Sequence, residues 1–304
     1  GIDLYAPDRK TVEVDLSDNT NRWGAHPDAL EAVRTASVER LTRYPVLYAD
    51  ALREAAAARF GVRPDQVTTG AGSDDVLDSL WRATAEFDGA VRYPAPTFSM
   101  IEPFCRMNGR EPSPVPWAGA AADPTLLLEG DPCLVYVCRP NNPTGHSVDR
   151  GWVDTLLEAA CALPGGGAVV VFDEADADYA GETLIPLAVE RPRTLVVRTL
   201  SKAYALAGAR VGLGFGTADT VLEVEKSRGP YKVGQLSELA AVAALNDAGG
   251  WVARTVEEAI ANRERFADEL RARGFDPLPS SANYLFVPVA DGTVTEVASA
   301  IRAH

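Results

Sequence analysis

The sequence has few of the residues that build metal sites and disulfide frameworks. It contains four cysteines, none of them in a Cys-x-x-Cys pair, and only three histidines among 304 residues. A structural zinc site needs about four such ligands at close spacing, and small secreted scaffolds need paired cysteines. We therefore expect no metal site, and the cysteine usage favours a reducing, cytoplasmic location.

Long hydrophobic runs and an excess of positive charge are also missing. No stretch of about 18 apolar residues occurs, so no membrane-spanning helix is predicted. Residues 1–10 lack the basic-then-apolar order of a signal peptide. Acidic residues outnumber basic ones by 43 to 29, which gives a net charge of −14. Because nucleic acids and anionic membranes bind clustered Lys and Arg, neither is an expected partner.

Short apolar runs alternate with helical patterns through the middle of the chain. The runs are nearly continuous in Val and Leu, which is typical of strands buried on both faces. Strands that alternate with helices predict an α/β fold with a parallel sheet covered by helices. The candidate strands lie at 67–70, 89–94, 133–138, 167–172, 194–200 and 210–216, and helical patterns begin near residues 50, 73 and 148.

From about residue 233 the pattern changes to long helices. Apolar residues recur at a spacing near 3.6 over 235–250 and 251–274, with charged residues between them. A strand with a turn is predicted at 280–287, and a last helix at 293–304. This part of the chain indicates the start of a second, smaller α+β unit.

Residues just after the predicted strands are the candidates for a functional site, because open α/β sheets bind ligands beyond the carboxyl ends of their strands. The segment "GAGSDD" follows the strand at 67–70, with Gly72, Ser73 and Asp74 at a helix start. Free backbone N–H groups there would bind an anion such as phosphate. The alternative is that Ser73 is an ordinary N-cap.

Three further segments follow strands in the same way. The turn "RPNNPTG" after 133–138 would direct the amide of Asn142 into the crevice, although it also fits a purely rigid turn. Asp173 follows 167–172, where a solvated turn is the alternative. Ser201 and Lys202 follow 194–200, with Arg210 eight residues beyond the lysine. A lysine at the end of a buried strand is unusual, and partial desolvation favours its neutral, nucleophilic amine.

Together these groups match the features of pyridoxal 5'-phosphate. A lysine amine matches its aldehyde, a carboxylate its ring nitrogen, an amide its phenolic oxygen, and an arginine with a helix start its phosphate. The combination of four such pieces in this order predicts a pyridoxal-phosphate enzyme.

The chain resembles the fold-type I pyridoxal-phosphate aminotransferases, and within them the histidinol-phosphate aminotransferase group. The resemblance runs from "NTNRWG" at 19–24 through "GAGSDD", "RPNNPTG", "DEAD" and "TLSKAYALAGARVG" to "SSANYLFV" at 280–287. It implies a large domain with a mostly parallel, seven-stranded sheet between helices, and a smaller α+β domain. It also implies an N-terminal arm at 1–30 that packs with the small domain, a large cofactor-binding domain at 31–250, and a small domain at 251–304.

The resemblance also assigns roles to single residues. Lys202 would bind the cofactor covalently, Asp173 would pair with the ring nitrogen, Asn142 would bond the phenolic oxygen, and Phe98 would stack on the ring. The phosphate would be surrounded by Gly72, Ser73, Asp74, Ser201 and Arg210. Tyr44 matches a tyrosine that reaches the phosphate of a neighbouring subunit, which implies a homodimer.

The chain departs from the family pattern in three places. Asp176 stands where the family has a tyrosine that bonds the phenolic oxygen, so it would either disturb the proton balance of the cofactor or bind a cationic group of the substrate; Tyr179 is an alternative source of the hydroxyl. Trp23 replaces a tyrosine near the substrate. The family continues after the helix matching 293–303 with strands and a substrate-binding arginine, so we expect the domain at 251–304 to be incomplete.

We expect an aminotransferase that acts on an amino acid or an amino alcohol phosphate, with a 2-oxo acid as acceptor. The departure at Asp176 keeps open a decarboxylase, cyclase or oxidase that uses the same cofactor on a basic amino acid. A cofactor-binding sensor domain of a transcription regulator is less favoured, because no helix-turn-helix or basic segment precedes residue 20.

Overall fold

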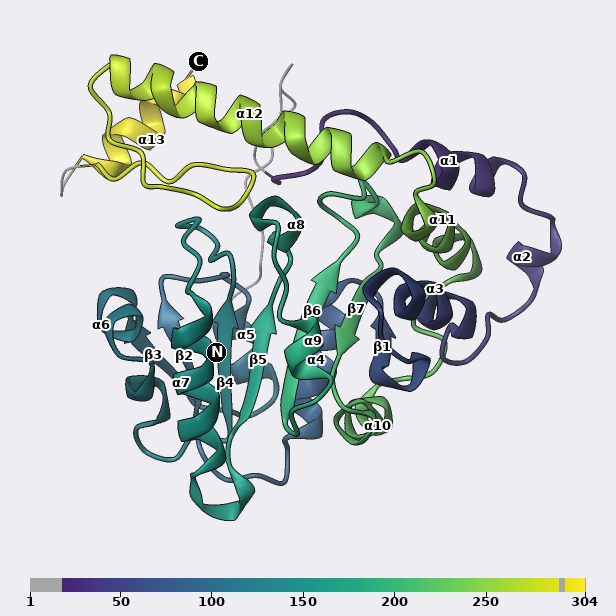
Figure 1. Ribbon diagram of the computed structural model, residues 1–304, viewed down its shortest axis with the longest axis horizontal. Coiled ribbons are helices and arrows are strands. Elements are labelled where there is room, and N and C mark those ends of the chain that lie inside the picture. The colour runs from purple at the N-terminus through teal and green to yellow at the C-terminus, as the bar shows by residue number, and fades with distance from the viewer. Residues whose placement is uncertain (1–17, 290–292, 304) are drawn as a thin grey trace.

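The computed structural model describes residues 18–289 and 293–303, and its centre is a seven-stranded sheet. The strand order is β1-β7-β6-β5-β4-β2-β3 (Figure 1). Neighbouring strands from β6 to β3 are parallel, and only β7 runs antiparallel to its neighbours β6 and β1. The strands are β1 (Val67–Gly70), β2 (Val91–Ala95), β3 (Pro112–Pro116), β4 (Leu134–Cys138), β5 (Val169–Asp173), β6 (Thr194–Thr199) and β7 (Gly212–Phe215).

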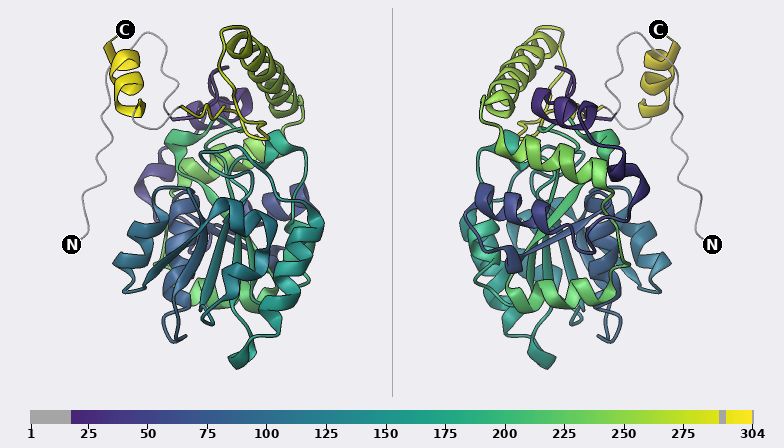
Figure 2. Two further views of the ribbon diagram at one scale, coloured as in Figure 1. Left: turned by 90° about the vertical axis from the view of Figure 1, so that its left-hand side faces the viewer. Right: turned by 90° about the vertical axis from the view of Figure 1, so that its right-hand side faces the viewer.

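Helices cover both faces of the sheet, as the two side views in Figure 2 show. Every residue of β4, β5 and β6 is buried, because successive side chains point to opposite faces and both faces carry helices. Val135, Val170 and Val196 join one hydrophobic cluster, and their chain neighbours Leu134, Val169 and Leu195 join the other. This two-sided burial confirms the α/β fold with a mostly parallel sheet.

The helices of the large layer follow the expected strand–helix alternation. Helix α4 begins at the predicted residue 73 and ends at Ala83. The longer helices before residue 250 are α1 (Pro27–Arg34), α3 (Asp50–Phe60), α4 (Ser73–Ala83), α5 (Ile101–Met107), α7 (Arg150–Cys161), α10 (Ala218–Ser227) and α11 (Gln235–Asn246), and the short ones are α2 (Glu39–Thr42), α6 (Trp117–Ala122), α8 (Ala177–Ala180) and α9 (Ile185–Ala188).

The C-terminal part lies above the carboxyl edge of the sheet. Helix α12 (Trp251–Ala272) crosses the top of the molecule, with α13 (Val294–Ala303) at one end of it (Figure 1). The strand predicted at 280–287 is wrong: residues 281–289 form no strand. The segment makes single backbone bonds, such as Leu278 N–H to the Phe286 carbonyl at 2.8 Å, and no paired ladder. Within the described ranges, no helix is long and apolar enough to cross a membrane.

Candidate active site

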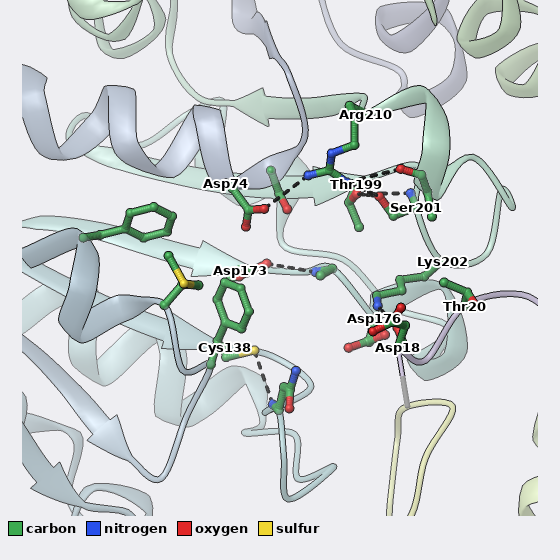
Figure 3. Close-up of a pocket in the computed structure, with 17 residues that line it drawn as sticks. Asp18, Thr20, Asp74, Cys138, Asp173, Asp176, Thr199, Ser201, Lys202 and Arg210 are labelled. Atoms are coloured by element: carbon green, nitrogen blue, oxygen red, sulfur yellow. Dashed lines mark hydrogen bonds and ion pairs between the residues drawn. The ribbon is translucent and has the colours of Figure 1, made fainter. Parts of the chain in front are cut away.

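Three parallel strands deliver side chains to one edge of the sheet. Cys138 ends β4 and lies beside Asp173, the last residue of β5, while Thr199 ends β6. Parallel neighbours bring their carboxyl ends to the same edge, and there they meet the start of α4. The residues enclose a cavity of about 670 Å³ (Figure 3).

The cavity collects most of the predicted site residues. It is lined by Ser73, Asp74, Phe98, Asn142, Asp173, Asp176, Ser201, Lys202 and Arg210. Gly72 immediately precedes α4, beside Arg210. Two predicted residues lie elsewhere in this chain. Trp23 lines a second cavity of about 880 Å³ below α12, and Tyr44 is 81% exposed and stacks on Tyr231 with ring centroids 5.0 Å apart.

Asp173 is a buried carboxylate held by two donors. Its Oδ2 accepts a hydrogen bond from the Tyr136 hydroxyl at 2.8 Å, and its Oδ1 accepts one from the Ala175 backbone N–H at 3.1 Å. Burial nevertheless raises the pKa of Asp173 to about 7, against the lowering effect of both donors. The site is therefore suited to a cationic or hydrogen-bond-donating partner that favours the ionised carboxylate.

Glu174 lies on the opposite side of the strand, as the two-residue period of a strand requires. It is fully buried, lies 3.4 Å from Arg198 and 3.8 Å from Arg139, and accepts the Leu184 backbone N–H at 2.6 Å. Its contacts hold the segment after β5 in place. Of the two acidic residues at the end of β5, Asp173 thus lines the cavity, and Glu174 makes buried contacts on the other side of the strand.

Lys202 enters the cavity from the segment after β6. Its Nζ donates a hydrogen bond to the Asp18 carbonyl at 2.5 Å, so the chain at 18–21 lies against the lysine. The Asn21 amide fixes this segment by donating to the Ala203 carbonyl at 3.2 Å. The N-terminal segment therefore closes one side of the cavity, and Thr20 lines it.

Arg210 and the start of α4 form the positive end of the cavity. Arg210 Nη2 lies 3.2 Å from Asp74 Oδ2, and Nη1 donates to Ser201 Oγ at 3.4 Å. Arg210 adopts a φ of 52°, a left-handed conformation that is strained for a residue other than glycine. Gly72, the N-cap, brings no side chain to the free N–H groups of α4. The arginine and these N–H groups suit an anion such as a phosphate.

Glycine is required where β7 passes this helix start. A Cβ on Gly212 would lie closer to the Gly72 and Ser73 backbone than van der Waals contact allows. We expect Gly212→Ala to displace the start of α4, to destabilise the fold by about 1–3 kcal/mol and to raise the dissociation constant for pyridoxal phosphate at least about tenfold, which corresponds to about 1.4 kcal/mol. Urea unfolding and a binding titration measure the two effects. Gly208→Ala is the matched control, because a Cβ there meets no atom within 4 Å; equal behaviour of the two variants would contradict the expectation.

The sequence analysis did not identify several residues that line the cavity or contact its carboxylates. Tyr136 could be found, because two-residue periodicity puts it on the same face as an inward Asp173 in the neighbouring strand. Asp18 and Thr20 carry no local signal, since the tertiary fold alone brings the N-terminal segment to Lys202. Tyr284 reaches the site from a segment predicted to be a strand, and its hydroxyl lies 3.3 Å from Asp176 Oδ2.

The side chains that line the cavity fit pyridoxal 5'-phosphate. A buried carboxylate with a raised pKa, an amine, and an arginine beside an uncapped helix start are three different groups, as a pyridine nitrogen, an aldehyde and a phosphate require. A Cβ on Gly72 would collide with the Arg210 guanidinium, so glycine at this position lets the arginine lie against the start of α4. The fold and the cavity thus define the class of pyridoxal-phosphate enzymes with a large α/β domain.

Comparisons with known proteins agree with this class. The family model "Aminotransferase class I and II" matches residues 11–304. Histidinol-phosphate aminotransferase from Gluconacetobacter diazotrophicus is 36% identical over 297 residues, which covers 95% of this chain and 80% of that protein. The chain belongs to the class I and II aminotransferase family, and it is a pyridoxal-phosphate-dependent aminotransferase.

Two solved structures show the same fold. Histidinol-phosphate aminotransferase from Sinorhizobium meliloti, in complex with pyridoxal-5'-phosphate, is 26% identical with a TM-score of 0.78, over 89% of this chain and 74% of that one. L-threonine-O-3-phosphate decarboxylase from Porphyromonas gingivalis is 19% identical with a TM-score of 0.80, over 94% and 85% of the two chains. Because an aminotransferase and a decarboxylase share the fold, the fold alone does not select the reaction.

Proposed function

We propose that this chain transfers an amino group from an amino acid or an amino alcohol phosphate to a 2-oxo acid, with a substrate like that of the histidinol-phosphate aminotransferases. The observation that carries the proposal is the meeting of Lys202, Asp173 and Arg210 in one cavity. When bound, pyridoxal phosphate supplies an electron-withdrawing ring for the carbon that bears the amino group. The chain's own residues hold that ring and move the proton.

Each residue has a task that follows from its place. Asp173 would keep a proton on the ring nitrogen, because it is a buried carboxylate that lines the cavity. Lys202 would hold the cofactor through Nζ and would then be the base for the proton of the substrate carbon. Phe98 would pack on the ring, and Asn142 would bond the phenolic oxygen. The residues that would hold the phosphate are Gly72, Ser73, Asp74, Ser201 and Arg210.

The test of the reaction is a product assay. The holoenzyme is incubated with 2-oxoglutarate and single amino donors, among them histidinol phosphate and basic amino acids, and glutamate is measured. Glutamate formation from a donor supports the proposal. Release of carbon dioxide without glutamate would support the second candidate, a decarboxylase acting on a basic amino acid, which Asp176 favours because its buried carboxylate lines the cavity.

We further propose a homodimer in which Tyr44 reaches the phosphate of the neighbouring subunit. Tyr44 lies in a short segment of the chain with several exposed apolar side chains: Val38, Leu41, Tyr44 and Val46 are each more than half exposed. Extensive exposed apolar surface is typical of protein–protein contacts. Sedimentation equilibrium tests this: a dimer mass supports the proposal, and a monomer at micromolar concentration would contradict it.

The division into domains at 31–250 and 251–304 is also a proposal, with residues 1–30 as an arm on the small domain. It is supported by α12, which lies across the sheet edge (Figure 1), and by bonds from the arm to the last part of the chain. Asn21 lies 3.4 Å from Thr255 Oγ1, and the Asn283 amide donates to the Asn19 carbonyl at 2.9 Å.

The cysteine usage supports a cytoplasmic location.

A further inference from the structure

Asp176 is the feature of the cavity that the proposed roles leave unexplained. It precedes α8, three residues after the end of β5, and lines the cavity although it is only 3% exposed. Figure 3 shows its carboxylate on the same side of the cavity as the Lys202 amine. A buried carboxylate beside the reactive lysine needs a physical reason.

The hydrogen bonds of Asp176 are incomplete among the described residues. Its Oδ2 lies 3.3 Å from the Tyr284 hydroxyl, but that hydroxyl also lies 3.2 Å from the Asn141 carbonyl. One hydroxyl proton serves both acceptors, so Asp176 receives at most a share of it. Its Oδ1 is buried and has no partner in the part of the chain that the structure describes. Because buried polar atoms are nearly always paired, Oδ1 indicates a partner that enters with the ligand or moves with it.

The charges around Asp176 identify that partner. Burial raises the pKa of Asp176 to about 6, and the Lys202 cation is the largest influence that lowers it. The carboxylate is therefore ionised at neutral pH and faces a positive nitrogen. The other titratable or charged groups that act on Asp176 or are acted on by it are Cys138, Asp173, Asp178, Tyr179, Arg198 and Tyr284.

Most of these neighbours are already engaged. Arg198 binds Asp178 and Glu174 on the far side of β6, and Asp173 accepts from Tyr136. Lys202 donates a hydrogen bond to a neutral acceptor, the Asp18 backbone carbonyl, and Asp18 also lines the cavity. Lys202 is thus the cation with the largest influence on Asp176 and also the group that would bind the cofactor.

We propose that Asp176 is a positioning residue that acts as the counter-ion of the Lys202 nitrogen, stabilising positive charge on that nitrogen when it is bound to the cofactor. The inference rests on the proposed function, because it needs Lys202 to bind pyridoxal phosphate. A nearby carboxylate favours the protonated, positively charged form of a titratable nitrogen and so raises its pKa. The bound cofactor therefore keeps its protonated, visible absorbance to higher pH than it does with a neutral residue at 176.

The test is a spectroscopic titration of the holoenzyme without substrate. The visible absorbance of bound pyridoxal phosphate is followed against pH in the unmodified protein and in Asp176→Asn. We expect the midpoint to fall by about 1–3 pH units, the effect of losing one neighbouring opposite charge. Tyr284→Phe keeps the carboxylate and is expected to move the midpoint far less. Asp178→Asn is the matched control: Asp178 lies in α8, which begins directly after Asp176, and its carboxylate is bound to Arg198.

The possible results distinguish a failure of the role of Asp176 from a failure of the proposed function. Asp176→Ala is a second neutral variant, for use if the Asp176→Asn protein does not fold. Midpoints of both neutral variants equal to that of the unmodified protein, or higher, would overturn the role of Asp176 and leave the cofactor assignment intact. If the unmodified protein develops no visible band, or if Lys202→Ala develops the same one, the proposed function itself fails.

Discussion

Replacement of Lys202 by alanine is expected to lower the rate of amino transfer by about 10²–10⁴-fold or more, the range for a lost catalytic acid–base group. Among the residues that the structure describes, Lys202 is the only lysine in the cavity lining, so no other described lysine is placed to move the proton. The same variant is expected to lose the visible absorbance that covalent attachment gives to pyridoxal phosphate. Steady-state kinetics and a spectrum measure both effects.

Lys226→Ala is the matched control for this change. Lys226 is exposed on α10, where it pairs with Glu223 at 2.6 Å, and α10 lies at the opposite end of the sheet from α8 and α12 (Figure 1). Its loss is expected to leave rate and spectrum unchanged. Normal turnover by Lys202→Ala would contradict the assignment of the lysine.

Replacement of Asp173 by asparagine is expected to have the second largest effect, a loss of about 10²–10³-fold in kcat. An asparagine carries no negative charge and cannot keep a proton on the ring nitrogen, so the electrostatic stabilisation of the reacting carbon is lost; removal of one such preorganised group has this size. Kinetics with saturating cofactor measure the effect. A rate within about twofold of the unmodified protein would contradict the role, since twofold is less than 1 kcal/mol.

The same substitution is expected to stabilise the cofactor-free protein. Because burial raises the folded-state pKa of Asp173 from 3.8 to about 7, the folded chain binds this proton more tightly than the unfolded chain. The ionised carboxylate therefore destabilises the fold progressively as pH rises from about 4 to about 7. Three pKa units correspond to about 4 kcal/mol as an upper limit, reduced by about 1–3 kcal/mol because asparagine has one acceptor for two donors.

Urea unfolding of the two proteins at several pH values tests this expectation. The free energy of unfolding of Asp173→Asn should exceed that of the unmodified protein near pH 8, and the difference should shrink towards pH 5. Asp176 is present in both proteins, so its own titration largely cancels in the comparison. Asp154→Asn on the surface of α7 is the control. A difference in the free energy of unfolding that stays the same at all pH values would contradict the raised pKa of buried Asp173.

The sheet was largely predictable because its central strands are buried on both faces. The runs at 133–138 and 167–172 are almost entirely apolar, which is typical of strands buried on both faces. Asp173 follows the second of these runs, Lys202 follows the strand predicted at 194–200, and both side chains line one cavity. Edge strands carry a weaker signal. β3 (Pro112–Pro116) was not predicted, because three of its five residues are prolines, which lack a backbone N–H. Prolines are tolerated in this strand because it lies at the edge of the sheet and pairs with β2 alone.

The parts that sequence patterns miss depend on contacts between distant segments. The antiparallel direction of β7 has no signature in "VGLGFG", because direction is set by the path of the connections. The strand predicted at 280–287 failed because alternating apolar residues also suit a segment that packs under α12 without a partner strand. Tyr284 and Asp176 are 108 residues apart, so their contact was not open to prediction from spacing.

Mapping the cofactor to one lysine tests the central claim most directly. The chain has four lysines, at 10, 202, 226 and 232. The holoenzyme is reduced with borohydride, digested, and analysed by mass spectrometry for the peptide that carries the phosphopyridoxyl group. We expect the label on Lys202 alone, in a stoichiometry of one per chain. A label on another lysine, or none after reconstitution, would contradict the assignment of this cavity as the cofactor site.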